Sequence, residues 1–183
     1  MSKFTIRPAR GDDISSITAI YRHAVETGTA SFELTPPDEA EMLRRHEALL
    51  TNGYPYLVCT RVEGGAERVL GYAYAGPYRP RPAYRGTVEN SVYVAPDAHR
   101  LGVGKALMGA IIEEATSRGY RQMVAVIGDS AHVASVGLHR SLGFEPVGTL
   151  KNVGRKFGRW LDCVLMQRAL GEGAESAPHQ EPT

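Results

Sequence analysis

The segment from Val88 to Leu107 constrains this chain most, because it joins an apolar strand, a proline, a glycine turn and the start of a helix. Pro96 ends the strand. Gly102 and Gly104 allow a tight bend, after which apolar residues recur at helical spacing. Along the strand, alternation places one set of side chains on one face, Glu89, Ser91 and Tyr93, and another set on the opposite face, Val88, Asn90, Val92 and Val94.

The helix start is a candidate seat for a pyrophosphate. Its first N–H groups have no partner within the helix, and its dipole is positive at that end, so residues 100–105 suit an anion. Two glycines before a helix also occur for packing reasons alone, and both interpretations are open here. A Walker loop would need glycine at His99 and Ser or Thr at Ala106, and a dinucleotide fingerprint would need glycine at Leu107, so both are excluded.

Composition narrows the class of protein. A chain of 183 residues with 43% hydrophobic content predicts a single soluble domain over residues 1–170. The remainder, residues 171–183, has no core residues, and its composition predicts a disordered tail. Because 21 basic residues balance 20 acidic ones, we expect neither nucleic acid nor a membrane as a partner.

Cysteine and histidine usage points to a cytoplasmic protein without a metal. Cys59 and Cys163 lie far apart in predicted strands, and the first residues show no apolar signal core. No apolar run approaches the roughly 20 residues that span a bilayer. The histidines lack metal-ligand spacing, so no metal is expected.

Before the central segment, the pattern predicts alternating helices and strands. We expect a strand over 3–9, a helix from Asp12 or Asp13 to Gly28, and a second helix from Asp38 to Leu50. Strands over 56–62 and 69–75 then form a hairpin with a longer loop. The stretch 76–86, rich in proline and arginine, cannot be a regular element.

After the central helix, we expect a strand over 122–127, a helix ending at Gly143, a loop containing GRKFGRW, and a strand over 161–166. Helices that join strands, with a hairpin before them, predict an α/β fold in which helices cover a mixed sheet. No repeat or linker divides the chain.

The order of the strand, the proline, R-L-G-V-G-K and S-x-x-L-H-R-S-L-G-F resembles the GNAT superfamily of acyl-CoA-dependent N-acyltransferases. Within it, AYAGPYRPRPAYRGTVENSVYV, VAVIG and KFGRWLDCVLMQ are similar to the phosphinothricin and methionine sulfoximine acetyltransferases. The resemblance covers nearly all of residues 4–170. It implies an N-acetyltransferase domain with a mixed, mostly antiparallel central sheet flanked by helices, and a homodimer.

The resemblance also implies acetyl-CoA as co-substrate, with its pyrophosphate on residues 100–105 and its pantetheine arm along residues 92–94. The cofactor-binding residues that it implies are Val92, Tyr93, Val94, Arg100, Leu101, Gly102, Val103, Gly104, Lys105, His132 and Ser135. His99 departs from the Arg or Gln frequent in the superfamily, and His132 stands where these enzymes usually have Asn.

Catalysis requires a base, because an alkyl amine with a pKa of about 10.4 is protonated at neutral pH. Glu89 matches the family's proposed base, acting directly or through a water; the alternative is a strand carboxylate in solvent or in an ion pair. His139 occupies the position where many members carry a tyrosine acid; the alternative is a packed helix histidine. A backbone N–H near residues 92–94 would stabilise the oxyanion. Neither cysteine has a histidine nearby in sequence, so we expect direct transfer in a ternary complex.

An amino-acid-like substrate with a carboxylate and a phosphinate or sulfone group needs several hydrogen-bond donors. The candidate substrate-binding residues are Phe32, Arg79, Arg81, Pro82, Ala83, Arg85, Glu89, Ser91, Lys156 and Arg159. For the arginines the alternative is a solvated basic loop. We expect Lys156 and Arg159 to add to the pocket, either from the same chain or from a second subunit.

We therefore expect an N-acetyltransferase that acts on the α-amine of a small amino-acid-like molecule. Two alternatives are a GNAT enzyme acting on another amine, such as a polyamine, an antibiotic or a protein N-terminus, and a non-catalytic acyl-CoA-binding module. Release of free thiol from acetyl-CoA separates the enzymes from the module.

Overall fold

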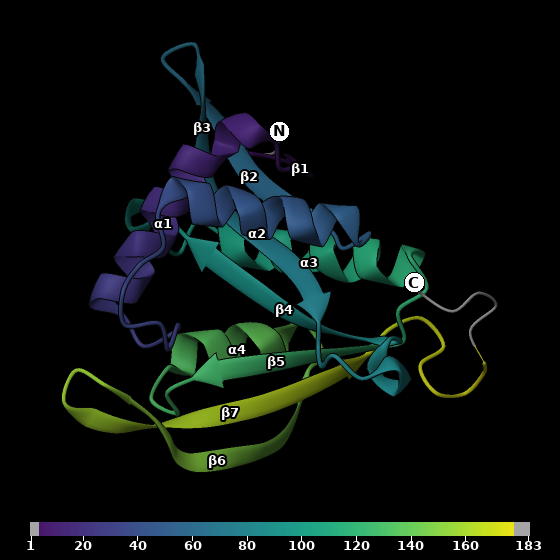
Figure 1. Cartoon of the computed structure of the whole chain (residues 1–183). Helices are drawn as coiled ribbons and strands as arrows, with labels where there is room; N and C mark the ends of the chain where they lie inside the picture. The colour runs from purple at the N-terminus through teal and green to yellow at the C-terminus, as the bar shows by residue number, and fades with distance from the viewer. Residues whose placement is uncertain (1–3, 178–183) are drawn as a thin grey trace.

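The computed structural model describes residues 4–177 of the chain (Figure 1). The helices are α1 (Ile14–Thr27), α2 (Glu39–Thr51), α3 (Val103–Ser117) and α4 (Val133–Ser141). The strands are β1 (Thr5–Pro8), β2 (Tyr56–Glu63), β3 (Ala66–Pro77), β4 (Thr87–Val94), β5 (Gln122–Gly128), β6 (Glu145–Lys156) and β7 (Arg159–Ala169).

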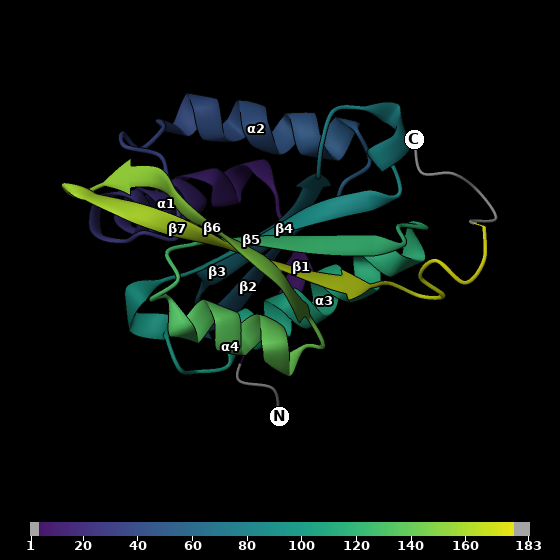
Figure 2. The ribbon, with the colours of Figure 1, turned by 90° about the horizontal axis from the view of Figure 1, so that it is seen from below.

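The strands form one seven-stranded sheet in the order β1-β2-β3-β4-β5-β7-β6. Neighbouring strands are antiparallel except for the parallel pair β4 and β5. Helices α1 and α2 cover one face, and α3 and α4 cover the other (Figure 2). The expected α/β fold, with a mixed, mostly antiparallel sheet flanked by helices, is confirmed.

The apolar periodicity of the sequence corresponds to the buried core. Ile17 and Val25 of α1 are buried on one side of the sheet, and Leu107 and Ile111 of α3 are buried on the other. The helix ends also follow local chemistry: the Asp38 carboxylate accepts a hydrogen bond from Glu41 N at 2.8 Å, which caps α2.

The β2–β3 hairpin corrects one expectation. Glu63 pairs with Ala66, so only Gly64 and Gly65 form the turn, and a longer loop was wrong. Both glycines have positive φ, 58° and 85°. Two-residue turns of this kind match the right-handed twist of their strands, and the two glycines adopt them without strain.

Strand β6 is a second correction, because a loop was expected where it runs. It pairs with β7 through a two-residue turn at Phe157 and Gly158. Side chains 145–153 of β6 are all exposed, so no alternation of buried and exposed positions marks the strand in the sequence. β6 is also an edge strand of the sheet.

The last described residues lie next to Arg121, which precedes β5. Arg121 Nη2 donates to Ser176 Oγ and to Ala177 O. The disorder expected for residues 171–183 stays a prediction, and residues 178–183 lie outside the described part. Among residues 4–177, no helix is both long and apolar enough to cross a membrane, and no three His, Cys, Asp or Glu side chains cluster as metal ligands.

Candidate active site

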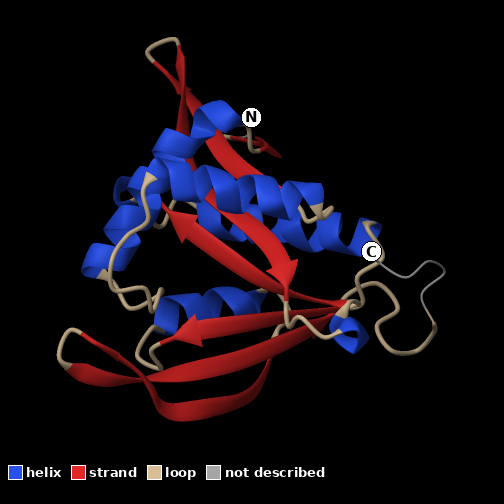
Figure 3. Cartoon of the chain, in the orientation of Figure 1, coloured by secondary structure: helices blue, strands red, loops and turns tan. Residues whose placement is uncertain are grey.

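The sheet opens between β4 and β5. Their register covers four pairs, from Thr87 with Gln122 to Asn90 with Ala125. Beyond these pairs, β4 continues along β3 and β5 continues along β7. The two arrows diverge in Figure 3, from the right of the view to the left. One edge of the β4 segment 91–94 therefore faces this opening rather than a strand of the described chain.

The main chain of Val92 and Val94 faces the opening. Ala95 N donates to Leu70 O across to the β3 side at 2.9 Å, and main-chain groups alternate in direction along a strand, so Val94 and Val92 point the other way. His99 Nε2 donates to Val94 O from that side at 3.1 Å. The N–H groups of Val92 and Val94 are thus directed to where an extended ligand could pair with β4.

The start of α3 has the geometry of an anion seat. Gly102, with φ of 85°, sets the turn that a residue with a side chain would adopt only with strain. Ala106 N makes the first helical hydrogen bond, to Gly102 O at 3.0 Å. The N–H groups of Val103, Gly104 and Lys105 precede this bond and lie outside the helical pairing. A diphosphate suits these donors and the positive end of the dipole.

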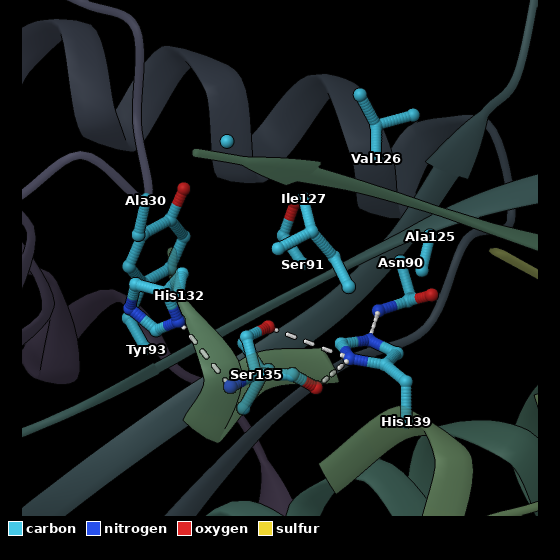
Figure 4. A pocket seen from close by; sticks show the side chains of 12 residues that line it. Ala30, Asn90, Ser91, Tyr93, Ala125, Val126, Ile127, His132, Ser135 and His139 are labelled. Atoms are coloured by element: carbon cyan, nitrogen blue, oxygen red, sulfur yellow. Dashed lines mark hydrogen bonds between the residues drawn. The ribbon is translucent and has the colours of Figure 1, made fainter. Parts of the chain in front are cut away.

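A small cavity lies in the opening next to α4, and we call it the α4 cavity (Figure 4). The ends of β4 and β5, the start of α4 and Ala30 line it. Its polar side chains are those of Asn90, Ser91, Tyr93, His132, Ser135 and His139. The structure thus brings together four of the expected cofactor and catalytic residues, Tyr93, His132, Ser135 and His139, with the main chain of Val92.

His132 and His139 have defined partners in the α4 cavity. His132 Nδ1 accepts from Ser135 N at 3.2 Å, which caps α4 as an asparagine would. His139 is 3% exposed, and its Nδ1 donates to Ser135 O at 2.8 Å. Burial lowers the pKa of His139, and the hydrogen bond to the Ser135 carbonyl raises it in part. The lowered pKa favours the neutral imidazole. The acid role expected for His139 stays a prediction.

On the other face, a cavity of about 360 Å³ lies between α2 and strands β3 and β4, and we call it the α2 cavity. A volume of this size is typical of a small-ligand site. The polar side chains around it are Arg44, Arg45, Tyr74, Glu89 and Ser91. Ser91 also lines the α4 cavity, so the two cavities meet at β4.

Glu89 is the half-buried carboxylate of the α2 cavity. Burial raises the pKa of Glu89, and the positive charge of Arg79 lowers it in part. A carboxylate with a raised pKa is a better proton acceptor, which suits a general base. The face predicted for Glu89 and Ser91 is the one that this cavity occupies.

The arginines of residues 78–86 lie beside Glu89 without lining the α2 cavity, whereas Gly76 and Pro77, which continue β3, do line it. The Arg79 guanidinium lies 5.1 Å from the ring centre of Tyr78. Arg81, Pro82, Ala83 and Arg85 are exposed. Of this expected substrate-binding group, Arg79 is linked to the site electrostatically, through its charge on Glu89.

The remaining expected substrate-binding residues lie around the loop between α1 and α2. Lys156 is buried and donates from Nζ to Ser31 O at 2.8 Å. Arg159 donates from Nη2 to Asp129 Oδ2 at 2.6 Å. Phe32 packs where side chains on Gly128 and Gly154 would otherwise lie. These residues do not line the α2 cavity, although Ala30 of the same loop lines the α4 cavity.

Sequence reasoning missed Arg45, Tyr74 and Asn90, which line the two cavities. Arg45 carries no sequence signal, since a charged residue on an amphipathic helix usually faces solvent. Asn90 had a signal: it is an amide on a strand face otherwise occupied by Val88, Val92 and Val94. A buried amide needs hydrogen-bond partners, and that requirement points to a polar site.

Comparisons with known proteins agree with this geometry. Residues 17–144 match the model of the Acetyltransferase (GNAT) family. A phosphinothricin N-acetyltransferase of Alcaligenes faecalis is 53% identical over 95% of this chain and 86% of its own length. An L-methionine sulfoximine/L-methionine sulfone acetyltransferase of Pseudomonas paraeruginosa is 46% identical over 95% of this chain and 98% of its own.

A solved structure shares the whole architecture. It is the crystal structure of a GNAT superfamily phosphinothricin acetyltransferase from Sinorhizobium meliloti in complex with AcCoA, with a TM-score of 0.92 and 49% identity. The match covers 97% of this chain and 94% of that one.

Proposed function

Because the chain belongs to the acetyltransferase (GNAT) family, we propose that it transfers acetyl from acetyl-CoA to the α-amine of a small amino-acid-like substrate of the phosphinothricin, methionine sulfoximine or methionine sulfone type. One observation carries the proposal: the α2 cavity, which holds Glu89, and the α4 cavity meet at Ser91. An amine on one side of β4 and a thioester on the other could therefore meet there.

Acetyl-CoA supplies the activated acetyl group, and the residues present fit it. The N–H groups of Val103, Gly104 and Lys105 suit the diphosphate, with Arg100, Leu101 and Gly102 forming the turn before them. Val92 and Val94 offer N–H groups for the pantetheine arm and the oxyanion. Three residues would form the wall beside the arm, Tyr93, His132 and Ser135.

Glu89 would take the proton from the substrate ammonium group within the α2 cavity. Its raised pKa and its place beside Ser91 support this role. Burial raises the pKa of Cys59 to about 11 and also raises that of Cys163, so both thiols are poor nucleophiles at neutral pH. We therefore propose direct transfer without an acyl-enzyme.

Recognition of the substrate's anionic groups is proposed for Arg79 first, since its charge acts on Glu89. Lys156 and Arg159 would act indirectly, by holding Ser31 and Asp129 beside the site. We also propose a homodimer in the cytoplasm. The dimer is supported by the exposed apolar side chains of the β6–β7 hairpin, among them Val153, Phe157 and Trp160.

The proposal is tested by measuring thiol release from acetyl-CoA with methionine sulfone, methionine sulfoximine and phosphinothricin against a panel of basic amines. Turnover restricted to the first group is expected. Turnover only with basic amines would assign the enzyme another substrate, and tight acetyl-CoA binding without turnover on any amine would make it a binding module.

Replacing Glu89 tests the base. Glu89→Gln is expected to lower kcat by about 100-fold or more, because only proton removal loses its acceptor. The dissociation constant for acetyl-CoA should stay within about twofold. The exposed Glu113→Gln on α3 is the matched control and should behave as the native protein does. A Glu89→Gln enzyme with native kcat would remove Glu89 from this role.

A further inference from the structure

Asn90 and His139 face each other across the wall of the α4 cavity (Figure 4). Asn90 Nδ2 lies 2.8 Å from His139 Nε2, and Ser135 O lies 2.8 Å from His139 Nδ1. Both side chains are buried, at 6% and 3% exposure. The three groups come from two elements, since Asn90 lies on β4 while Ser135 and His139 lie on α4.

The hydrogen-bond chemistry fixes the proton on the ring. A carbonyl oxygen only accepts, so His139 Nδ1 must carry the hydrogen that Ser135 O receives. In a neutral imidazole, Nε2 is then unprotonated and presents a lone pair. The Asn90 group facing it must therefore be the NH₂ donor. With the carboxamide reversed, two acceptors would face each other at 2.8 Å.

The remaining atoms of the Asn90 carboxamide are only weakly held. Its Oδ1 is buried and has no hydrogen-bond partner in the described part of the chain. Besides the imidazole, Nδ2 contacts only Met108 Sδ, at 3.6 Å, and sulfur is a weak acceptor. Reversing the carboxamide thus sacrifices little apart from the contact with His139, and it would turn Oδ1 toward Nε2.

We infer that Asn90 is a positioning residue of the proposed transfer reaction: its NH₂ group occupies the Nε2 lone pair of His139, so this imidazole exchanges a proton at Nε2 only when the carboxamide rotates by about 180°. The neutral ring needs the NH₂ group opposite Nε2, whereas the protonated ring needs Oδ1 there. The orientation of Asn90 and the protonation of His139 therefore change together.

Few other groups lie close enough to influence the protonation of His139. The titratable side chains facing the same cavity are Tyr93 on β4 and His132 at the start of α4. On α3 the neighbour is Met108, and Phe144 packs edge-on to the imidazole with ring centres 5.0 Å apart. Burial is the main cause of the lowered pKa of His139, and no charged side chain of residues 4–177 contributes.

The first test uses the unmodified protein and ¹⁵N NMR of its histidines. His139 should appear as the neutral form protonated at Nδ1, with a hydrogen bond from Asn90 to Nε2, at pH 6.5, where a free histidine is half protonated. A ring protonated at Nε2, or one that titrates near pH 6.5 as a free histidine does, would overturn the inference. This measurement does not require turnover, so it remains decisive if the proposed function fails.

The second test is Asn90→Asp, which has nearly the same shape but places a carboxylate opposite Nε2. The His139 titration midpoint should rise by at least about one pH unit, since an opposite charge stabilises the imidazolium. The limb of the kcat–pH profile that reports the titration of His139 should move by the same amount. The KM for acetyl-CoA should stay within about twofold of the native value.

Met108→Leu is the matched control, because it removes the other contact of Asn90 and keeps the core volume. It should leave the imidazole signals and the pH profile unchanged. A profile of Asn90→Asp that superimposes on the native one, or a shift of equal size in Met108→Leu, would mean that Asn90 only packs the cavity wall.

Discussion

Glu89 shows how one residue acquires its chemistry from two opposing effects. Burial in the α2 cavity favours the neutral carboxylic acid, and Arg79 favours the carboxylate. If Glu89 is the base, as proposed above, this balance sets the pH below which it is protonated and inactive. Neither effect belongs to Glu89 alone, so each can be changed separately by mutation.

Arg79→Ala should move the acid limb of the kcat/KM profile to higher pH. Removing the positive charge raises the pKa of Glu89 further, and the carboxylate form that the proposed base requires is then lost at a higher pH. The measurement is kcat/KM between pH 5 and 9. Arg118→Ala, at the far end of α3, should leave the limb in place. A limb moving to lower pH would contradict the electrostatic assignment.

His46 makes a second prediction for a single residue. It is buried on α2 and packs edge-on against Tyr56, with ring centres 4.9 Å apart. Burial lowers the pKa of His46 below its ordinary value of 6.5. Because the unfolded chain binds the proton more readily, stability is fully present above about pH 6.5 and falls as the pH drops through the folded pKa.

His46→Leu should therefore reduce the loss of stability between pH 7.5 and pH 5. Urea unfolding at both pH values measures it. His23→Gln, at an exposed position of α1, is the control and should keep the native acid sensitivity. Equal acid sensitivity in the native and His46→Leu proteins would show that other groups determine it.

At the residue scale, the sequence predicted what depends on the strand's own alternation. The faces of Glu89, Ser91 and Asn90 follow from the period of two. The neighbours of Arg45 and Lys156 do not, because they come from segments remote in the chain: Arg45 bonds to Glu33, and Lys156 bonds to Ser31. Such partners depend on how the elements pack, which no local pattern encodes.

Among the elements, the loop between α1 and α2 is held against the open edge of the site by several contacts. Thr29 Oγ1 donates to Asp129 Oδ2 at 3.1 Å, and the Phe32 ring lies over Gly128 of β5 and Gly154 of β6. A Cβ on Gly154 would be 2.3 Å from the Phe32 ring. A Cβ on Gly128 would be 2.4 Å from Thr29 O, and thus against backbone.

Gly154→Ala and Gly128→Ala should both destabilise the fold, by about 1–3 kcal/mol. Phe32→Ala should relieve Gly154→Ala in the double variant, because the ring is what the new methyl group meets. It should relieve Gly128→Ala only in part, since the contact of the new methyl group with the Thr29 carbonyl remains. Thermal unfolding of the single and double variants measures the coupling.

Gly148→Ala is the control for this series, because the space around Gly148 in β6 is open. It should cost less than about 0.5 kcal/mol. Additive effects of Phe32→Ala and Gly154→Ala would contradict the contact between them.

Prediction of the elements succeeded where one face is buried and failed where none is. Helices α1 to α4 and strands β1 to β5 carry apolar periodicity, and all of them were expected. Strand β6 exposes side chains 145–153 on both faces, so its pattern resembles a loop. β6 forms a strand because it pairs with β7, and this pairing stabilises it through main-chain hydrogen bonds rather than through buried side chains.

For the whole molecule, this same edge strand determines the proposed assembly. β6 is the last strand of the sheet, and its side chains include Val147, Leu150 and Val153, all exposed. Exposed apolar edges of this length invite pairing with another chain. A homodimer formed there would cover them.

Val153→Lys should convert the proposed homodimer to a monomer, because it places a charge on the exposed edge strand that the proposed contact would cover. Light scattering after size exclusion measures the mass. Val62→Lys is the control, since Val62 is 72% exposed on β2, at the opposite side of the sheet, and Val153 is 53% exposed. A dimer that survives Val153→Lys would place the interface elsewhere, and a native monomer would refute the homodimer.

The parting of β4 from β5 also predicts how the two reactants bind relative to each other. Because donor and acceptor would approach from opposite sides of the sheet, neither blocks the entrance of the other, and each can dissociate while the other stays bound. Free coenzyme A should then compete with the thioester yet leave the amine's route clear, and saturating amounts of one reactant should not inhibit the other. A site with a single entrance would require the two reactants to bind in a fixed order, whereas separate entrances on the two sides of the sheet would not.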